Sequence, residues 1–331
     1  MGSTGIRRVS DGHTNGDVRS SGSDGLSRNP LRVRVPASSA NLGPGFDVYG
    51  MALTLWAEVE IAGPECADES ASKGDHALGV EHPAMVAFRA AGGRGDLGLR
   101  CAIPSGRGLG FSGAVRVAGV SLGMAEAAGI TAADLGAFID AHRGDIMNQA
   151  SALEGHGDNV AASLYGGVTA AVPRGDALYD VVQVPVSTRL IDGYSIAVWV
   201  PSFQTSTAKS RRSLSPTVSR QDAVFNVAQA VRLSVAFMTG DGHGLQATRE
   251  DRLHQDQRLT DTPLSRRALD TMMRAGALTG WLSGSGPTVA ALCTTTSLSA
   301  IEAALAGDTE LFGHGRALGL GIDTQGLQAA R

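Results

Sequence analysis

The chain has 331 residues, a length that suits two ordinary domains or one large one, and 43% of them are hydrophobic, which allows a sizeable core. Its formal charge of −4 argues against a nucleic-acid-binding protein, because such a chain does not concentrate the cations that neutralise phosphates. No apolar run of about 18 residues could span a bilayer, and the N-terminus lacks the apolar segment of a signal peptide, so we expect a cytoplasmic protein without a membrane partner.

The N-terminal residues 1–29 are rich in Gly, Ser, Asp and Arg, so burial could not offset the entropy of ordering them, and a disordered tail is predicted. Alternating apolar and polar residues then predict strands over 31–35 and 52–61. The remaining expected strands are 97–103, 166–172, 195–200 and 288–293, and the expected helices are 112–128, 132–150, 223–238 and 264–274.

These strands and helices are mixed without the regular βαβ alternation of a doubly wound sheet, which favours the α+β class with two-layer domains. We place the boundary near Pro185, so that the domains would span 30–185 and 186–331. The three cysteines, Cys66, Cys101 and Cys293, lie far apart and lack the spacing of metal ligands, which predicts reduced, buried thiols.

The segment PSGRGLGFSG follows an expected strand and opens an expected helix. Glycines allow positive φ, so that successive N–H groups can point inward, and a helix N-terminus adds partial positive charge. These properties predict an anion cradle for phosphate groups, and the alternative is a tight turn without a ligand. Its residues are Pro104, Ser105, Gly106, Arg107, Gly108, Leu109, Gly110, Phe111, Ser112 and Gly113.

This loop has features in common with three other glycine-containing motifs. GLGFSG fits the dinucleotide fingerprint G-x-G-x-x-G, but the acidic residue expected about 20 positions on would be near Asp134, inside a predicted helix. A Walker loop needs Gly-Lys, and neither Lys73 nor Lys209, the only lysines, follows a glycine. A nucleophile elbow needs a glycine where Ala114 stands.

Two further polar segments flank expected secondary structure. PASSANLGPGFD places Asn41 and Asp47 on a stiff loop between two strands, either as binding groups or as ordinary turn residues. EGHGDN contains Glu154, a carboxylate that could hold Mg²⁺ beside a phosphate cradle, with a capping turn as the alternative. We interpret His156 in this segment as structural.

Arginines and a second glycine turn supply the last candidates. The segments 207–212 and 251–258 carry guanidinium groups that could hold a carboxylate by two parallel hydrogen bonds, although surface ion pairs are the alternative. The turn SGSGPT at 283–288 could line the far side of a cleft with its backbone.

In this order, PASSANLGPGFD, GRGLGFSGA, EGHGDNVA, VSRQDAVFN, DRLHQ and SGSGPTV resemble the motifs of homoserine kinases, a family of the GHMP small-molecule kinase superfamily. The resemblance covers roughly residues 31–293. It implies an N-terminal ATP-binding domain of the ribosomal-protein-S5-like α+β type, a ferredoxin-like α+β C-terminal domain, and often a homodimer. It also implies ATP- and Mg²⁺-dependent phosphorylation of the L-homoserine hydroxyl in threonine biosynthesis.

The resemblance implies roles for single residues at the amino-acid end of the site. Asn41 and Asp47 would hold the amino acid, with Asp47 facing its ammonium group. Arg211 and Arg258 would clamp its carboxylate. Ser283 and Gly284 of the second glycine turn would line the substrate side.

At the phosphate end, the resemblance implies that Glu154 and Ser112 lie at the magnesium ion and that Thr207 lies near substrate and nucleotide. Asn159 matches an asparagine that stands where other GHMP kinases have an aspartate. The implied mechanism is therefore positioning and electrostatic stabilisation without a strong base. Asp158, next to it, remains an open alternative as a base.

The sequence departs from the family pattern at Phe111, which replaces a loop serine and removes a hydroxyl group. The resemblance implies an adenine pocket within residues 63–93, where the sequence also departs from the family pattern. Two alternatives therefore stay open: a GHMP kinase acting on another small hydroxy acid or amino acid, and a weakly active nucleotide-binding homologue.

Overall fold

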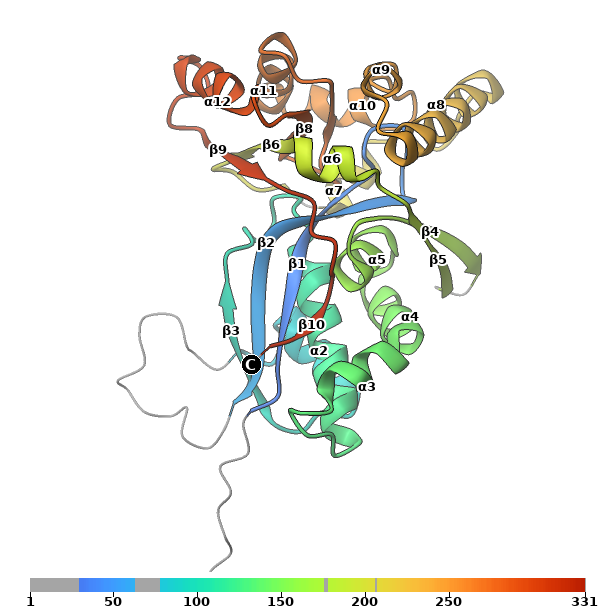
Figure 1. Cartoon of the computed structure of the whole chain (residues 1–331), viewed down its shortest axis with the longest axis vertical. Helices are drawn as coiled ribbons and strands as arrows, with labels where there is room; N and C mark the ends of the chain where they lie inside the picture. The colour runs from blue at the N-terminus through green and yellow to red at the C-terminus, as the bar shows by residue number, and fades with distance from the viewer. Residues whose placement is uncertain (1–29, 63–77, 176–177, 206, 331) are drawn as a thin grey trace, which may run out of the picture.

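The computed structural model describes residues 30–62, 78–175, 178–205 and 207–330. Within them, two antiparallel sheets lie one above the other, each with its own helices (Figure 1). The expected tail at 1–29, Cys66 and much of the expected adenine-pocket segment lie outside the described residues.

The first sheet has the strand order β10-β1-β2-β4-β5, and β3 also pairs with β2. Its interior side is apolar, with Val33 and Val35 fully buried, as the alternating pattern predicted. The long strand β2 pairs with β3 along one half and with β4 at its start. The strands are β1 (Arg32–Ala40), β2 (Tyr49–Ala62), β3 (Asp96–Cys101), β4 (Val168–Gly175), β5 (Leu178–Val184) and β10 (Gln328–Ala329).

Five helices in the described ranges accompany this sheet, and α2 packs against β1 and against α1, α4 and α5. Two glycines of α2 allow it to pack closely against α1. A Cβ atom at Gly119 would lie 2.3 Å from the Ala84 carbonyl oxygen of α1, and one at Gly123 would lie 2.4 Å from the Phe88 carbonyl oxygen. The helix expected over 132–150 is interrupted at His142, where φ is −114°, so it forms α3 and α4. The helices are α1 (Pro83–Ala90), α2 (Phe111–Ala127), α3 (Leu135–Ala141), α4 (Arg143–Glu154) and α5 (Asp158–Tyr165).

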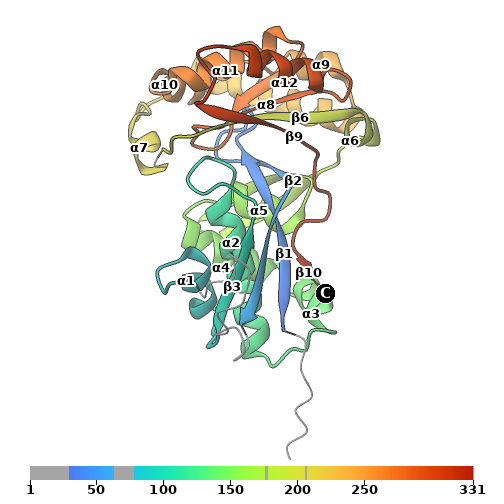
Figure 2. The same ribbon diagram turned by 90° about the vertical axis from the view of Figure 1, so that its left-hand side faces the viewer.

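The second sheet has the antiparallel order β7-β8-β6-β9, formed by β6 (Tyr194–Pro201), β7 (Thr279–Leu282), β8 (Val289–Thr294) and β9 (Gly315–Leu320). Figure 2 shows the helices α8 to α12 of this half stacked above it. Helices precede β7 and β9, so the chain follows the β-α-β-β-α-β path of a ferredoxin-like unit. The helices are α6 (Thr188–Gly193), α7 (Thr207–Arg212), α8 (Arg220–Thr239), α9 (Gly242–Gln246), α10 (Gln255–Thr260), α11 (Pro263–Arg274) and α12 (Leu298–Gly307).

After β9 the chain returns to the first sheet. Trp56 donates a hydrogen bond from Nε1 to Asp323 Oδ2 at 2.8 Å, and β10 then pairs with β1, opposing Ala329 to Val33. Among the described residues, the chain therefore crosses between the sheets before β6 and again after β9. The division into domains at Pro185 stays a prediction.

The described cysteines differ in burial. Cys293 is buried in the second core, whereas Cys101 is exposed, so the prediction of buried thiols was wrong for Cys101. The reason is its place at the last residue of β3, which pairs with β2 alone. None of the helices in the described ranges is long and apolar enough to cross a membrane.

Candidate functional site

Most of the candidate residues line one cavity of about 420 Å³. Its walls come from the loop after β1, the glycine loop before α2, the α4–α5 junction, helices α7 and α10, and the turn after β7. Both halves of the fold thus contribute to it. The lining residues are Asn41, Asp47, His82, Pro83, Ser105, Gly106, Gly108, Gly110, Phe111, Ser112, Glu154, His156, Asp158, Asn159, Thr205, Arg211, Arg258, Gly284, Ser285 and Gly286.

The glycine loop requires its glycines for both dihedral angles and space. Gly106, Gly108 and Gly110 have φ of +67°, +79° and +67°, a region that other residues rarely adopt. A Cβ atom at Gly110 would lie 2.0 Å from Ser38 Oγ, and one at Gly108 would lie 2.4 Å from the Ser283 carbonyl oxygen. The loop is therefore packed tightly against β1 on one side and the turn after β7 on the other.

The predicted phosphate-loop residues separate into two groups. Ser105, Gly106, Gly108, Gly110, Phe111 and Ser112 line the cavity. Leu109 is buried in the first core, and Gly113 packs on the Asn159 side chain. Arg107 turns away, since its Nε and Nη2 donate to the carbonyl oxygens of Pro201 and Ser202 at 2.9 Å each, and with Pro104 it lines a separate hollow.

Ser283 lies behind the loop and outside the cavity lining. It is fully buried and is one member of a hydrogen-bond chain that crosses between the two sheets. Trp281 Nε1 donates to Ser39 Oγ at 2.8 Å, Ser39 and Ser283 share a hydrogen bond of 2.7 Å, and Ser283 Oγ donates to the Gly108 carbonyl oxygen at 2.6 Å. Its neighbour Gly284 does line the cavity.

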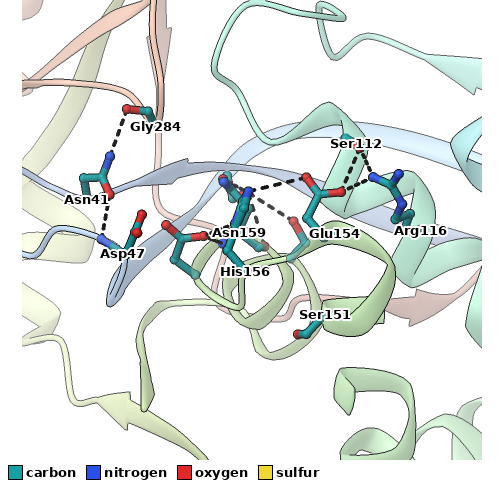
Figure 3. Close-up of polar contacts among 12 residues, drawn as sticks. Asn41, Asp47, Ser112, Arg116, Ser151, Glu154, His156, Asn159 and Gly284 are labelled. Atoms are coloured by element: carbon teal, nitrogen blue, oxygen red, sulfur yellow. Dashed lines mark hydrogen bonds and ion pairs between the residues drawn. The ribbon is translucent and has the colours of Figure 1, made fainter. Parts of the chain in front are cut away.

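Glu154, the last residue of α4, faces the start of α2 (Figure 3). Ser112 Oγ donates to Glu154 Oε2 at 2.8 Å. Arg116, one turn further along α2, donates from Nη1 to the same Oε2 atom and to Ser112 Oγ. The sequence predicted the proximity of Ser112 and Glu154 only through the family resemblance, and it did not predict Arg116.

The partly buried His156 and the buried Asp158 form a pair at the α4–α5 junction, with Nδ1 and Oδ1 separated by 2.6 Å. Burial alone would raise the pKa of Asp158, but the hydrogen bond and charge of His156 outweigh it and lower that pKa. Conversely, burial lowers the pKa of His156, and its hydrogen bond to Asp158 with the charges of Asp158 and Glu154 outweighs that effect and raises it. Asn159 follows, and its Oδ1 accepts from Ser38 Oγ at 2.9 Å.

The loop after β1 carries the polar groups at the other end of the cavity. Asn41 Nδ2 donates to the Gly284 carbonyl oxygen at 2.8 Å, and Asn41 Oδ1 accepts from the Asp47 backbone N–H at 3.0 Å. Asn41 and Asp47 have positive φ, a strained conformation that often marks functional positions. The Asp47 carboxylate binds the Arg211 guanidinium by two hydrogen bonds of 2.7 and 2.9 Å.

Arg258 differs from Arg211 in having no ion-pair partner in the part of the chain that the structure describes. It is 4% exposed, and its Nη1 donates to the Gly284 carbonyl oxygen at 3.3 Å. Its Nε atom is buried and has no hydrogen-bond partner in the described residues, and the same is true of Thr205 Oγ1, which also belongs to a cavity residue. Burial lowers the pKa of Arg258, partly offset by the charge of Asp47. A buried guanidinium of this kind can receive an anionic ligand.

Sequence reasoning missed several cavity residues. His82 and Pro83 belong to the start of α1, a helix that was not expected. His156 lines the cavity although we interpreted it as structural. Thr207 begins α7, but its side chain lies outside the described part of the chain.

Comparison with known proteins gives consistent matches. The family model "GHMP kinases C terminal" matches residues 242–310. A homoserine kinase of Desulfitobacterium hafniense is 35% identical over 325 residues, covering 89% of this chain and 98% of that protein. A homoserine kinase of Moorella thermoacetica is 38% identical over 271 residues, covering 79% and 86%.

Solved structures agree in fold. A homoserine kinase from Cytophaga hutchinsonii superposes with a TM-score of 0.72 at 23% identity, covering 92% of this chain and 98% of that one. A mevalonate kinase of L. major, solved in complex with R-mevalonate, superposes with a TM-score of 0.57 at 16% identity, covering 90% and 96%. The expected α+β GHMP kinase fold is confirmed.

Proposed function

This chain belongs to the homoserine kinase family, and from that premise we propose that it transfers the γ-phosphate of ATP to the side-chain hydroxyl of L-homoserine. The hydroxyl oxygen attacks the γ-phosphorus, the bond to the departing ADP oxygen breaks, and the hydroxyl proton is released. The product is O-phospho-L-homoserine, which is used in threonine biosynthesis. One observation carries the proposal: the cavity is lined both by the glycine loop before α2 and by the buried Arg258, whose guanidinium has no ion-pair partner in the described residues.

The charged end of the cavity supports an amino-acid substrate. Arg258 offers a buried cation for a carboxylate, and Asp47 offers an anion for an ammonium group. A zwitterionic ligand would share the Asp47–Arg211 pair, with its carboxylate on the arginines and its ammonium on Asp47. A neutral sugar would leave Arg258 without a counter-charge, so this end disfavours a sugar.

The phosphate end supports a mechanism without a strong base. Asn159 lies beside the glycine loop, where its amide can position groups but cannot accept a proton readily. Asp158 is the alternative base, but its lowered pKa and its hydrogen bond to His156 make it a poor proton acceptor. Transfer would then depend on alignment of the hydroxyl with the γ-phosphate and on stabilisation of the phosphoryl charge.

Glu154 and Ser112 are the residues that would hold Mg²⁺. Both present oxygen atoms beside the glycine loop, which suits a hard cation that takes one or two carboxylates and completes its shell with phosphate and water. Such an ion would neutralise charge on the phosphates during transfer.

Coupled ADP release tests the assignment. We expect turnover that depends on L-homoserine, with much lower rates for other small hydroxy acids and hydroxy amino acids. Comparable rates with one of those compounds would favour the alternative of a GHMP kinase with another substrate. ATP binding without any substrate-dependent ADP release would overturn the kinase assignment and favour the weakly active homologue suggested by Phe111.

We also propose a homodimer, and we keep a cytoplasmic location as a prediction. The exposed face of α8 supports self-association, because its apolar side chains recur at helical spacing and each is more than half exposed. They are Val224, Val227, Val231, Val235 and Met238. A two-fold interface uses the same patch on both copies, so an apolar helix face can pack on its symmetry mate.

Size-exclusion chromatography with light scattering tests the dimer. We expect Val227→Lys with Val231→Lys to shift the protein to the mass of a monomer. The exposed Val80→Lys substitution, before α1, is the control and should leave the mass unchanged. A dimer that survives the double substitution would show that α8 is not the interface.

A further inference from the structure

The carboxylate assigned to the metal already contacts a cation of the chain itself. Glu154 Oε2 accepts hydrogen bonds from Ser112 Oγ and from Arg116 Nη1, and Figure 3 shows the guanidinium directly opposite this oxygen. The other carboxylate oxygen, Oε1, lies 3.8 Å from His156 Nε2. Arg116 therefore binds the same Glu154 oxygen that accepts a hydrogen bond from the Ser112 hydroxyl.

The position of Arg116 is fixed by the helix that carries it. Arg116 follows Ser112 by four residues on α2, so both side chains lie on the same helix face. The side chains of Arg116 and Glu154 are 20% and 10% exposed, so water screens their attraction only weakly. Arg116 Nε is also buried and has no hydrogen-bond partner in the described ranges.

Arg116 and a metal ion cannot both bind Glu154 Oε2 closely. A divalent cation and a guanidinium carry the same sign of charge, and each needs the lone pairs of that oxygen. A metal that binds there must therefore displace Arg116, and the loss of the ion pair subtracts from the metal's binding free energy.

We propose that Arg116 is an internal counter-cation that holds Glu154 until a divalent metal displaces it, so that the nucleotide-free protein binds the metal only weakly. The proposal rests on the proposed function, which places the metal at Glu154 and Ser112. Arg116 thereby acts as a positioning residue that restricts metal binding to the nucleotide complex. The phosphates bring further oxygen ligands that Arg116 does not block.

The alternative is that the Arg116–Glu154 pair only braces α2 against α4. If the pair has only this structural role, removal of Arg116 should lower the stability of the protein and leave its metal affinity unchanged. A counter-cation predicts a gain in metal affinity that disappears when Glu154 is also neutralised. The two can be separated by direct metal binding.

The test measures Mn²⁺ binding to the full chain without nucleotide or homoserine, from the loss of the free Mn²⁺ signal in electron paramagnetic resonance. We expect Arg116→Met to bind Mn²⁺ at least about tenfold more tightly than the wild type, and Arg116→Gln to behave likewise if the first variant folds poorly. The gain should be absent from Arg116→Met combined with Glu154→Gln. Arg174→Met removes an exposed arginine that pairs with Asp180, controls for net charge, and should bind as the wild type does.

Two results would overturn the proposal. One is wild-type Mn²⁺ affinity in folded Arg116→Met and Arg116→Gln, with circular dichroism confirming the fold. The other is a gain in affinity that persists when Glu154 is replaced by Gln. Neither measurement requires turnover, so a failure of the homoserine kinase activity in the ADP assay would be distinguishable from a failure of this proposal.

Discussion

The Arg211 guanidinium binds the Asp47 carboxylate through two parallel hydrogen bonds, from Nη1 to Oδ2 at 2.7 Å and from Nη2 to Oδ1 at 2.9 Å. Arg211 belongs to α7 of the second half and Asp47 to the loop after β1 of the first half, so the pair links the two halves at the cavity. Asp47 and Arg211 were expected to bind the ammonium and the carboxylate of an amino acid, and in this structure they bind each other. A zwitterionic substrate would bind by joining this pair.

Asp47→Asn should raise the KM for homoserine by about 5- to 30-fold, equivalent to roughly 1–2 kcal/mol, because the ammonium group loses its counter-charge. The effect is smaller than for a buried pair, since both side chains are more than a third exposed. The KM for ATP should change little. Asp180→Asn, which disrupts an exposed pair with Arg174, is the control, and an unchanged homoserine KM in Asp47→Asn would contradict the assigned role.

Arg258→Ala should weaken homoserine binding by roughly 2–4 kcal/mol, because the substrate carboxylate loses a desolvated partner. Stability should respond differently. A buried cation without an ion-pair partner costs folding free energy, so Arg258→Met should leave the denaturation midpoint unchanged or raise it. Arg267→Met is the contrast, because Arg267 does pair with Asp308.

Steady-state kinetics and urea denaturation of both Arg258 variants provide the measurements. An unaltered homoserine KM would remove Arg258 from the carboxylate site. A marked loss of stability in Arg258→Met would show that the arginine serves the fold instead.

Glu154→Gln should lower kcat and raise the Mg²⁺ concentration needed for half-maximal rate, because a metal ligand loses its charge. It also leaves Arg116 without its counter-ion, which should lower stability by about 1–3 kcal/mol at this partial burial. Adding Arg116→Met should restore stability and leave kcat low. Normal turnover of Glu154→Gln at low Mg²⁺ would count against the metal assignment.

Gly110→Ala should impair nucleotide binding and lower stability by roughly 2–4 kcal/mol, combining the cost of positive φ with overpacking against Ser38. Gly129 offers a matched control, because its φ is +69° and a Cβ atom there would contact nothing within 4 Å. Gly129→Ala should therefore cost only about 1–2 kcal/mol. Equal losses in both variants, measured by denaturant unfolding, would show that the contact with Ser38 is unimportant.

The His156–Asp158 pair should make stability depend on pH. The raised pKa of His156 contributes stability that is complete below its unfolded value of 6.5 and is lost as pH rises through the folded value. The lowered pKa of Asp158 contributes stability that is present above 3.8 and is lost as pH falls through its folded value. The pair therefore stabilises most strongly between these limits.

His156→Gln should remove the loss of stability above pH 6.5, as measured by urea unfolding at a series of pH values. His243→Gln, at an exposed position in α9, is the control and should keep the wild-type profile. An unchanged profile in His156→Gln would mean that another group causes the dependence.

Elements with strong local patterns were predicted, and those defined by tertiary contacts were not. Strand β2 and the helices α2 and α11 matched the expected ranges closely, whereas β1 was expected only over 31–35 and continues to Ala40 through its pairing with β2. The break between α3 and α4 was missed, since His142 is neither Gly nor Pro. The two-residue strand β10 exists only through its pairing with β1.

At the candidate site, too, features that depend on tertiary contacts could not be predicted from the sequence. Motifs identified the segments that surround the cavity, but they could not show that Arg107 turns away or that Ser283 lies behind the loop. Arg116 stands within a run of small and apolar residues, and only the packing of α2 on α4 brings it to Glu154. Side-chain direction across two elements is a property of the folded chain.

The hydrogen bonds behind the glycine loop determine which way its peptide groups face. The carbonyl oxygens of Gly108 and Leu109 are both engaged on the protein side, by Ser283 Oγ and by the Ser38 N–H. In a trans peptide the N–H group points opposite to the C=O group, so the N–H groups of Leu109 and Gly110 are turned the other way. Two serines from distant parts of the chain thus set the polarity of the loop before any anion arrives.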